Sequence, residues 1–302
     1  LSKLSNLTQL TLDLSESRVK DIEPLSMLSN LKQLTLNLRD AQVSDLQWLS
    51  KLNNLAQLSL FAGRDVEFYL ELLPKLSNRT QITLIFSEYE ISDLESLSKL
   101  SNQTQLMLYY YGKLNSLEPL LQLNNLTRLE LESDLGQVKN LEPLSKLSNL
   151  KELTLDLGQS QGRDLEPLAK LGDETQLTLD FSNSSTSNLE LLAKLGNRTQ
   201  LALNLGHNKV RNLEPLSKLS SLAQLTLALG GSEVSDLGGL SKLSNLTQLN
   251  LDLSRSEVSS WEPPLNQDNR AQMMHDRFRS TSDVHNMEPL SKTELEKLLL
   301  LL

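Results

Sequence analysis

Leucines alternate with polar residues in short runs that recur at an almost constant interval along the chain. In the first complete run, Leu10, Leu12 and Leu14 are separated by polar residues. A period of two residues is typical of a strand with one buried face and one wet face. Eleven runs begin at Leu10, Leu34, Leu58, Ile82, Leu106, Leu129, Leu153, Leu177, Leu201, Leu225 and Leu249. Each run predicts a strand of about five or six residues.

A second apolar spacing follows each predicted strand. In the first unit Leu25, Leu28 and Leu31 recur every three residues, which is typical of a helical or 3-10 segment with one buried stripe. Asp21 and the pair Glu23-Pro24 precede this stripe. Asp suits a helix N-cap, Pro suits the first turn, and an acidic side chain suits the positive end of the helix dipole. We therefore expect one short helical segment in each unit.

The interval between the runs is 24 residues, apart from one step of 23 residues between Leu106 and Leu129. A fixed period of this size indicates a solenoid, in which each unit needs a neighbour to bury its leucines. We predict an α/β solenoid, curved and right-handed, with a parallel β-sheet on the concave face and short helical or 3-10 segments on the convex face. The array should occupy residues 1–260. Residues 261–302 should form a degenerate repeat and C-terminal cap, because His275 and Arg277 occupy former leucine positions.

The units resemble leucine-rich repeats. Leu7, Leu10 and Leu12 match the Leu-x-x-Leu-x-Leu core, and Val19–Leu25 is similar to the Val-x-Asp-Ile-x-Pro-Leu segment of the bacterial internalin type. The unit is longer than the usual internalin unit, which we attribute to an extended strand that carries Leu14. Ser15 and its counterparts stand where the family pattern places Asn. The resemblance implies a binding scaffold whose concave sheet contacts a partner, and it implies no catalytic site.

Two short motifs follow from the repeat itself. Glu precedes Lys by four residues in Glu71/Lys75, Glu95/Lys99, Glu142/Lys146, Glu166/Lys170, Glu190/Lys194 and Glu214/Lys218. We interpret these pairs as a solvated outer face on which each pair stabilises its own helical turn. The turn Asn also creates Asn-x-Thr sequons at Asn6, Asn78, Asn102, Asn125, Asn197 and Asn245. The recurrence of the turn is a sufficient explanation for these sequons.

The charge and cysteine content narrow the class of partner. The chain has 29 basic and 38 acidic residues and a formal net charge of -9, which argues against nucleic-acid or anionic-membrane binding and is compatible with a basic protein partner. It has no cysteine, so disulfide caps and thiolate metal sites are excluded, which favours an intracellular setting over the bacterial cell surface or secretion. No apolar run is long enough to span a bilayer. We expect a monomer.

An apolar stretch interrupts one polar column of the predicted concave face. The position of Asp13 is polar in most copies, but three consecutive copies have Phe61, Ile85 and Tyr109 there. Aromatic residues at the centre of a wet sheet resemble interface anchors, and drift of a long repeat is the alternative. The predicted apolar partner-binding patch consists of Phe61, Ile85, Met107, Tyr109 and Tyr111.

The copies that follow are acidic in the same column. Glu132, Asp156 and Asp180 fall on successive predicted strands, where neighbouring like charges are unfavourable unless something offsets them. Arg128 beside Glu152 offers partial compensation, a basic partner or a cation offers more, and a screened, solvated face is the alternative. The 23-residue step falls in this region, so we expect local irregularity. The predicted acidic partner-binding patch consists of Glu130, Glu132, Glu152, Asp156 and Asp180.

Catalysis finds little support in the sequence. The three histidines, His207, His275 and His285, are scattered, and neither a phosphate-binding loop nor a dinucleotide fingerprint occurs. An open sheet does not desolvate paired carboxylates. We expect no enzyme, no catalytic residue, no cofactor and no metal. The leading hypothesis is a non-enzymatic protein-binding scaffold. The alternatives are a glycan-binding surface that stacks on Tyr109 and Tyr111, and the recognition arm of a larger multidomain enzyme or signalling protein.

Overall fold

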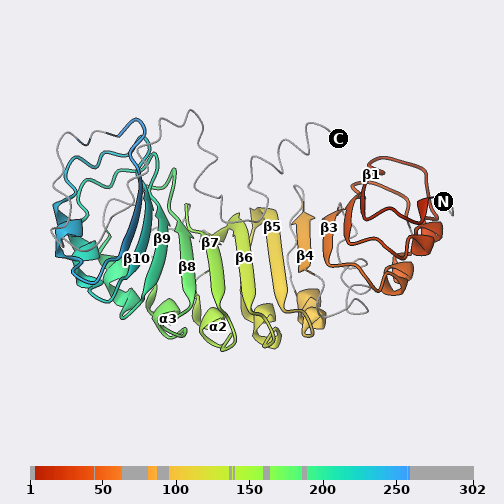
Figure 1. Cartoon of the computed structure of the whole chain (residues 1–302), viewed down its shortest axis with the longest axis horizontal. Helices are drawn as coiled ribbons and strands as arrows, with labels where there is room; N and C mark the ends of the chain where they lie inside the picture. Colours follow the sequence, from red (N-terminus) through yellow and green to blue (C-terminus); the bar gives the residue numbers. More distant parts are fainter. Residues whose placement is uncertain are drawn as a thin grey trace. The chain divides into compact units, whose positions relative to one another are not determined.

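The computed structural model describes residues 4–43, 45–62, 81–86, 95–135, 138, 140–158, 164–185, 189–256 and 258. The chain divides into two compact units, residues 1–154 and residues 155–302. Within each unit, parallel strands lie side by side and the helical segments lie on one side of the strands (Figure 1). The predicted degenerate repeat and cap, residues 261–302, lies outside the described residues.

In the first unit the strands follow one another in sequence order and pair in parallel. The strands are β1 (Gln9–Asp13), β2 (Gln33–Asn37), β3 (Gln57–Ala62), β4 (Gln81–Phe86), β5 (Gln105–Lys113) and β6 (Arg128–Asp134), and β7 (Glu152–Asp156) begins near the end of the unit. The helical segments are η2 (Glu23–Met27), η3 (Gln47–Lys51), η5 (Glu95–Leu100), η6 (Glu118–Gln122) and α2 (Glu142–Ser145).

The second unit repeats this organisation. Its strands are β8 (Gln176–Asp180), β9 (Gln200–Asn204), β10 (Gln224–Ala228) and β11 (Gln248–Asp252), and its helical segments are α3 (Glu166–Ala169), η8 (Glu190–Leu195), η9 (Glu214–Lys218) and η10 (Gly238–Lys242). Leu201, Leu225 and Leu249 are register partners on β9, β10 and β11. The predicted fold class, parallel strands that alternate with short helical or 3-10 segments, is confirmed.

The core lies between the strands and the helical segments of successive copies. Leu34 and Leu36 of β2 are 1% and 0% exposed, and Leu28 and Leu31 of the preceding helical stripe are equally buried. This burial of leucine surface is the main stabilising contribution, since each fully buried leucine contributes roughly 1.5–3 kcal/mol. The inward aromatic residues Phe86 and Tyr110 are 2% exposed, as expected for substitutes of core leucines.

An Asp or Asn side chain ends most of the five-residue strands. The Asp13 carboxylate accepts a hydrogen bond of 2.7 Å from the Ser15 N–H, which turns the chain out of the sheet. The same turn forms at Asn37/Arg39, Asp156/Gly158, Asp180/Ser182, Asn204/Gly206 and Asp252/Ser254. The prediction of an extended strand that carries Leu14 is therefore wrong. Leu14 is buried, but it lies in the turn that follows β1.

A left-handed residue follows five of these turns, and also the turn in the copy of β10, at the same position of the repeat. It is a non-glycine residue with φ between 52° and 57° at Glu16, Asp40, Asn183, His207 and Arg255, and it is Gly231 with φ 67° in the copy of β10. Non-glycine residues adopt this conformation only when the surrounding structure enforces it. The enforcing contacts are backbone hydrogen bonds to the next copy, such as the His207 N–H to the Gly230 carbonyl at 3.0 Å.

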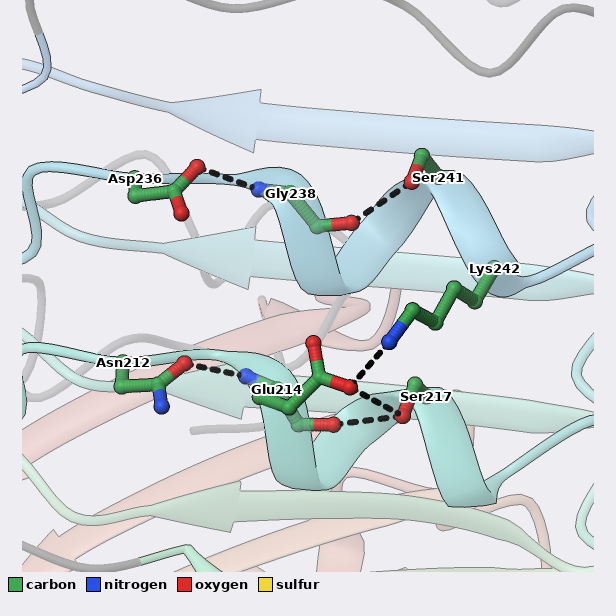
Figure 2. A network of polar contacts seen from close by, with 7 residues as sticks. All are labelled: Asn212, Glu214, Ser217, Asp236, Gly238, Ser241 and Lys242. Carbon is green, nitrogen blue, oxygen red and sulfur yellow. Dashed lines mark hydrogen bonds and ion pairs between the residues drawn. The ribbon is translucent and has the colours of Figure 1, made fainter.

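The helical segments begin with a second side-chain turn (Figure 2). Asn212 accepts a hydrogen bond of 2.7 Å from the Glu214 N–H, and Asp236 accepts one of 2.7 Å from the Gly238 N–H. The Asp21 side chain does the same for the Glu23 N–H at 2.8 Å. The prediction that an Asp initiates the helical segment therefore holds, although the carboxylate binds the N–H two residues ahead.

Lysines connect neighbouring copies on the helical side. Lys242 pairs with Glu214 of the preceding copy (Figure 2), Lys218 pairs with Glu190, and Lys194 pairs with Asp164 at 2.8 Å. The prediction that Glu190/Lys194 and Glu214/Lys218 pair within one turn is wrong, because each lysine contacts a carboxylate of the preceding copy instead. Glu142 and Lys146 do pair within one turn, at 3.5 Å.

The recurring turn Asn also links one copy to the copy before it. The side-chain amide donates a hydrogen bond of 2.8 Å to a backbone carbonyl in the pairs Asn30/Ser5, Asn54/Ser29, Asn125/Ser101, Asn149/Asn124 and Asn245/Ser220. This contact gives the Asn a structural role in the repeat. The sequons that contain Asn125 and Asn245 therefore include an amide that is already hydrogen-bonded.

Candidate functional site on the polar face of the sheet

The polar face is the side of the sheet that carries the positions of Gln9, Thr11 and Asp13. In the first unit the column of Asp13 continues in register through Asn37, Phe61, Ile85, Tyr109 and Glu132. The structure thus brings the apolar residues of this column together on adjacent strands. It also places Tyr109 directly beside Glu132, where the apolar and acidic stretches meet.

The apolar residues of this column, and Met107 in the neighbouring column of Thr11, are buried, not exposed. Phe61 is 5% exposed, Ile85 is 4% exposed, and Met107 and Tyr109 are each 2% exposed. Tyr111 lies in β5, and its side chain is outside what the structure describes. The described members of the predicted apolar patch are thus a packed layer of the polar face, and the ring of Tyr109 offers little surface for stacking. Their contact with a partner stays a prediction.

A buried phenol–carboxylate pair joins the two predicted patches. The Tyr109 hydroxyl donates a hydrogen bond of 2.5 Å to Oε1 of Glu130, and Glu130 is 6% exposed. Burial, together with the charge of Glu130, raises the pKa of Tyr109 well above its usual value. Tyr109 therefore stays protonated and remains a donor to Glu130. The sequence pattern had assigned these two residues to separate patches.

Two charged residues lie at the start of the strands beside this pair. Arg128 contacts Glu152 at 3.0 Å between guanidinium and carboxylate oxygen, so the expected compensation of Glu152 by Arg128 is confirmed. The Glu152 side chain is 48% exposed and that of Arg128 is 22% exposed, while Glu132 is half-buried. In this part of the first unit, the predicted acidic residues accessible to a partner are therefore Glu132 and Glu152.

Asp156 and Asp180 have a structural role that the sequence analysis missed. Each accepts the backbone hydrogen bond of the turn that ends its strand, at 2.8 Å and 2.7 Å. In the second unit, Asp180 also accepts a hydrogen bond of 3.0 Å from the Asn204 side-chain amide. The predominance of Asp and Asn in this column was the signal for such a turn. Partner binding by these two carboxylates stays a prediction.

Strand length changes where the column loses its Asp or Asn. With Phe61, Ile85, Tyr109 and Glu132 in this position, β3 and β4 have six residues, β5 has nine and β6 has seven. The register between β5 and β6 shifts between Tyr110 and Lys113. The irregularity expected from the 23-residue step is therefore present, as an extension of β5.

A column of glutamines was overlooked in the sequence. Eleven strands occur in the described residues; nine of them begin with Gln, and the other two begin with Arg128 and Glu152. In the first unit a hollow of about 390 Å³ is lined by Thr8, Gln9, Lys32, Gln33, Ala56, Gln57, Gln81 and Gln105. The signal was available in the sequence, because Gln precedes the leucine run at the same position in nine copies.

The described residues contain neither a cluster suited to a metal ion nor a helix suited to a membrane. In that part of the chain, no three His, Asp or Glu side chains are grouped closely enough to hold a metal ion. Over the same residues, no helix has the length and apolar character needed to cross a bilayer.

Repeated parallel strands, short helical turns and an inward leucine core define a leucine-rich repeat fold. Among solved structures it is similar to an internalin (inlF) from Listeria monocytogenes, with 23% identity over 90% of this chain and 87% of that chain and a TM-score of 0.49. Internalin C2 (inlC2) of the same organism is 25% identical over 80% of each chain, with a TM-score of 0.31.

A leucine-rich repeat protein from Leptospira interrogans is 19% identical over 85% of this chain and 86% of that chain, with a TM-score of 0.40. No protein-family model matches the chain, and no curated protein matches it closely enough to count as a relative.

Proposed function

We propose that this chain is a non-enzymatic scaffold that binds a protein with a basic surface. The contact surface lies on the polar face of the first unit, around Tyr109, Glu130, Glu132 and Glu152. Phe61, Ile85 and Met107 form the packed layer beside these residues.

One observation carries this proposal. A regular strand ends with Asp or Asn. In four consecutive strands this position is instead occupied by Phe61, Ile85, Tyr109 and Glu132. Phe61 and Ile85 have no polar side-chain atom and the Tyr109 hydroxyl binds Glu130, so these three residues do not form the side-chain turn of the regular copies. The column here is instead apolar and buried at one end, and acidic and partly exposed at the other.

The charge of this surface selects the partner. Glu132 is half-buried and Glu152 is exposed, so both can contact a cationic side chain without complete loss of hydration. Charges at the rim of an interface mainly steer encounter and set specificity. The net charge of -9 acts in the same direction, because it attracts a basic partner over longer distances at low salt.

The experiment is charge reversal at Glu132. Proteins retained by the immobilised wild-type chain are identified by mass spectrometry, and the retained protein is then titrated calorimetrically against purified variants. We expect Glu132→Lys to weaken its binding by about tenfold at low salt. The matched control is Glu118→Lys, an exposed glutamate on η6, which should leave the affinity unchanged.

Two outcomes would contradict the proposal. Equal affinity of the wild-type chain and Glu132→Lys would exclude the acidic surface as the contact. Equal weakening by Glu118→Lys would show that net charge, and not this surface, determines binding.

A further inference from the structure

Five strands of the first unit begin with a glutamine on the polar face. Gln9, Gln33, Gln57 and Gln81 are consecutive register partners on β1 to β4, and Gln105 begins β5. Together with Thr8, Lys32 and Ala56 they line the hollow of about 390 Å³. These eight residues form the glutamine groove. The groove lies at the opposite end of the strands from the column of Phe61 and Tyr109.

Hydrogen bonds join side-chain amides of the glutamine groove, and each amide donates to the glutamine of the following strand. The Gln33 amide donates to Gln57 Oε1 at 2.7 Å, and the Gln57 amide donates to Gln81 Oε1 at 3.3 Å. The Gln81 amide is the last in this row, and it donates a hydrogen bond of 3.6 Å to the Met107 sulfur. A primary amide has two N–H donors and two acceptor lone pairs. Each bridging glutamine therefore keeps a donor and an acceptor for a ligand.

The second unit provides an internal comparison. Gln176, Gln200, Gln224 and Gln248 also begin strands in the same column. Among the hydrogen bonds of the described residues in that unit, none joins one of these glutamines to another. The ordered row of amides is therefore not an automatic result of placing glutamine at the start of every strand.

The lining of the glutamine groove indicates the chemistry of its ligand. Apart from Lys32 it is uncharged, and it contains no aromatic or large aliphatic side chain. Protein interfaces are anchored by such side chains, so this surface is poorly suited to a protein partner. Sugar hydroxyls both donate and accept hydrogen bonds, which matches the free donor and acceptor of each amide.

The spacing of the strands adds a geometric argument. Neighbouring strands are about 4.8 Å apart, so successive amides recur at roughly the length of one sugar ring. We propose that the glutamine groove binds an unbranched oligosaccharide that crosses β1 to β4, with about one sugar ring for each strand. This site is independent of the proposed protein-binding surface and of stacking on Tyr109.

The test uses three purified linear hexasaccharides as probes: β-1,4-linked glucose, β-1,4-linked N-acetylglucosamine and α-1,4-linked glucose. Binding to the whole chain is followed by saturation-transfer NMR and by titration. Because the groove is shallow and polar, we expect a Kd on the order of 1 mM for at least one probe. Gln33→Ala with Gln57→Ala should abolish the signal.

The matched control is Gln200→Ala with Gln224→Ala in the second unit, which should bind as the wild type does. Gln57→Glu provides a second variant, since it keeps the size of the side chain and replaces the amide by a charge. It should weaken binding by about tenfold or more while the thermal unfolding midpoint stays unchanged. No binding of any probe by the folded wild-type chain, or equal loss in the control variant, would overturn the proposal.

Discussion

Strands β8, β9 and β11 end where an Asp or Asn side chain accepts a hydrogen bond from the backbone, whereas β3 to β5 have Phe61, Ile85 and Tyr109 in this position and are longer. The same position of the repeat thus has two uses. In the regular copies it is a turn-former and its side chain is committed to the backbone. In the copies of β3 to β5, called the aromatic copies, its side chain belongs to the packed layer of the polar face, and the strands are longer.

The copy of β10 refines this comparison. Ala228 stands in the turn-forming position, and β10 nevertheless has five residues. The turn is then supported by the backbone alone, through the Leu229 N–H to the Asp252 carbonyl at 2.8 Å and the positive φ of Gly231. Loss of the side-chain bond is therefore not enough to extend a strand. The large apolar side chains of β3 to β5 also favour the extended conformation.

The largest expected effect comes from removing the aromatic ring at the centre of the aromatic copies. Tyr109→Ala should lower the free energy of unfolding by about 3–5 kcal/mol, because it leaves a cavity and removes the hydrogen bond to Glu130. Tyr109→Phe should cost only about 1–3 kcal/mol, since it removes the hydroxyl alone. Urea unfolding followed by circular dichroism measures both, and equal costs would mean that the ring contributes nothing.

A buried arginine supports the regular copies. Arg198 is 0% exposed, and its guanidinium donates to the backbone carbonyls of Leu168, Leu171, Gly172 and Thr175. Burial lowers its pKa, but at neutral pH the group keeps its charge. Arg198→Ala should cost about 2–4 kcal/mol, because the carbonyls lose their donors and a cavity remains.

The matched variant for this prediction is Arg198→Leu. It reproduces the side chain that Leu222 and Leu246 provide at the same position of later copies, so it should cost less than Arg198→Ala in the same unfolding measurement. Equal costs for the two variants would show that the carbonyl contacts, and not the filled volume, dominate.

In the copy of β5, the repeat position of Arg198 is occupied by a buried glutamine whose amide has no hydrogen-bond partner among the described residues. Gln103 is 0% exposed, and both polar atoms of its amide lack a hydrogen-bond partner. Gln103→Leu should therefore raise the free energy of unfolding by about 1–3 kcal/mol, because a buried polar group without a partner is costly. Thermal unfolding of this single variant gives the result, and a lowered midpoint would mean that Gln103 is satisfied in solution.

The turn-formers themselves should have a smaller effect. Asp180→Ala should cost about 1 kcal/mol, since it removes the contact to the Ser182 N–H but leaves the backbone turn that Ala228 tolerates. Hydrogen exchange at the end of β8 would localise the change. If Asp180→Ala lowered the free energy of unfolding as much as Tyr109→Ala does, the regular and aromatic copies would not differ in how this position contributes to stability.

The smallest effect is a pH dependence at Asp13. Burial acts to raise the pKa of Asp13, but hydrogen bonds from Ser15 and Asn37 outweigh it and lower the pKa below its usual value of 3.8. Its contribution to stability is present above that usual value and is lost as the pH falls through the lowered value. Asp13→Asn keeps the turn and should remove this acid sensitivity, which we expect to be below about 1 kcal/mol. Unfolding measured between about pH 5 and 2 tests it, and an unchanged slope would exclude Asp13 as the cause.

The fold was predictable because one leucine pattern is repeated eleven times, so an error in any single copy is corrected by the others. Leu34 and Leu58 had to occupy equivalent strands, and they are register partners. The role of Asp13 was not predictable from alternation alone, since a polar residue on a wet face satisfies the pattern whether or not it bonds to the backbone.

The candidate site was predictable in its placement and not in its exposure. The column position put Phe61, Ile85 and Tyr109 side by side, and the register agrees. Their burial depends on the packing of neighbouring side chains, which period-two patterning does not contain. The pairing of Lys218 with Glu190 was missed for a similar reason. It depends on the distance between copies, whereas the sequence directly shows only the spacing within a copy.

The left-handed residues that follow these turns have a practical consequence. Glu16, Asp40, Asn183, His207 and Arg255 are all exposed, they differ in size and charge, and they share one backbone conformation. Since the chain has no cysteine, a single cysteine at any of them would be a unique attachment point for a dye or spin label. Labels at a pair such as Asn183 and His207 would lie on successive copies, at a separation fixed by the backbone. Distance measurements between two spin labels could then follow changes in the spacing of copies within the second unit.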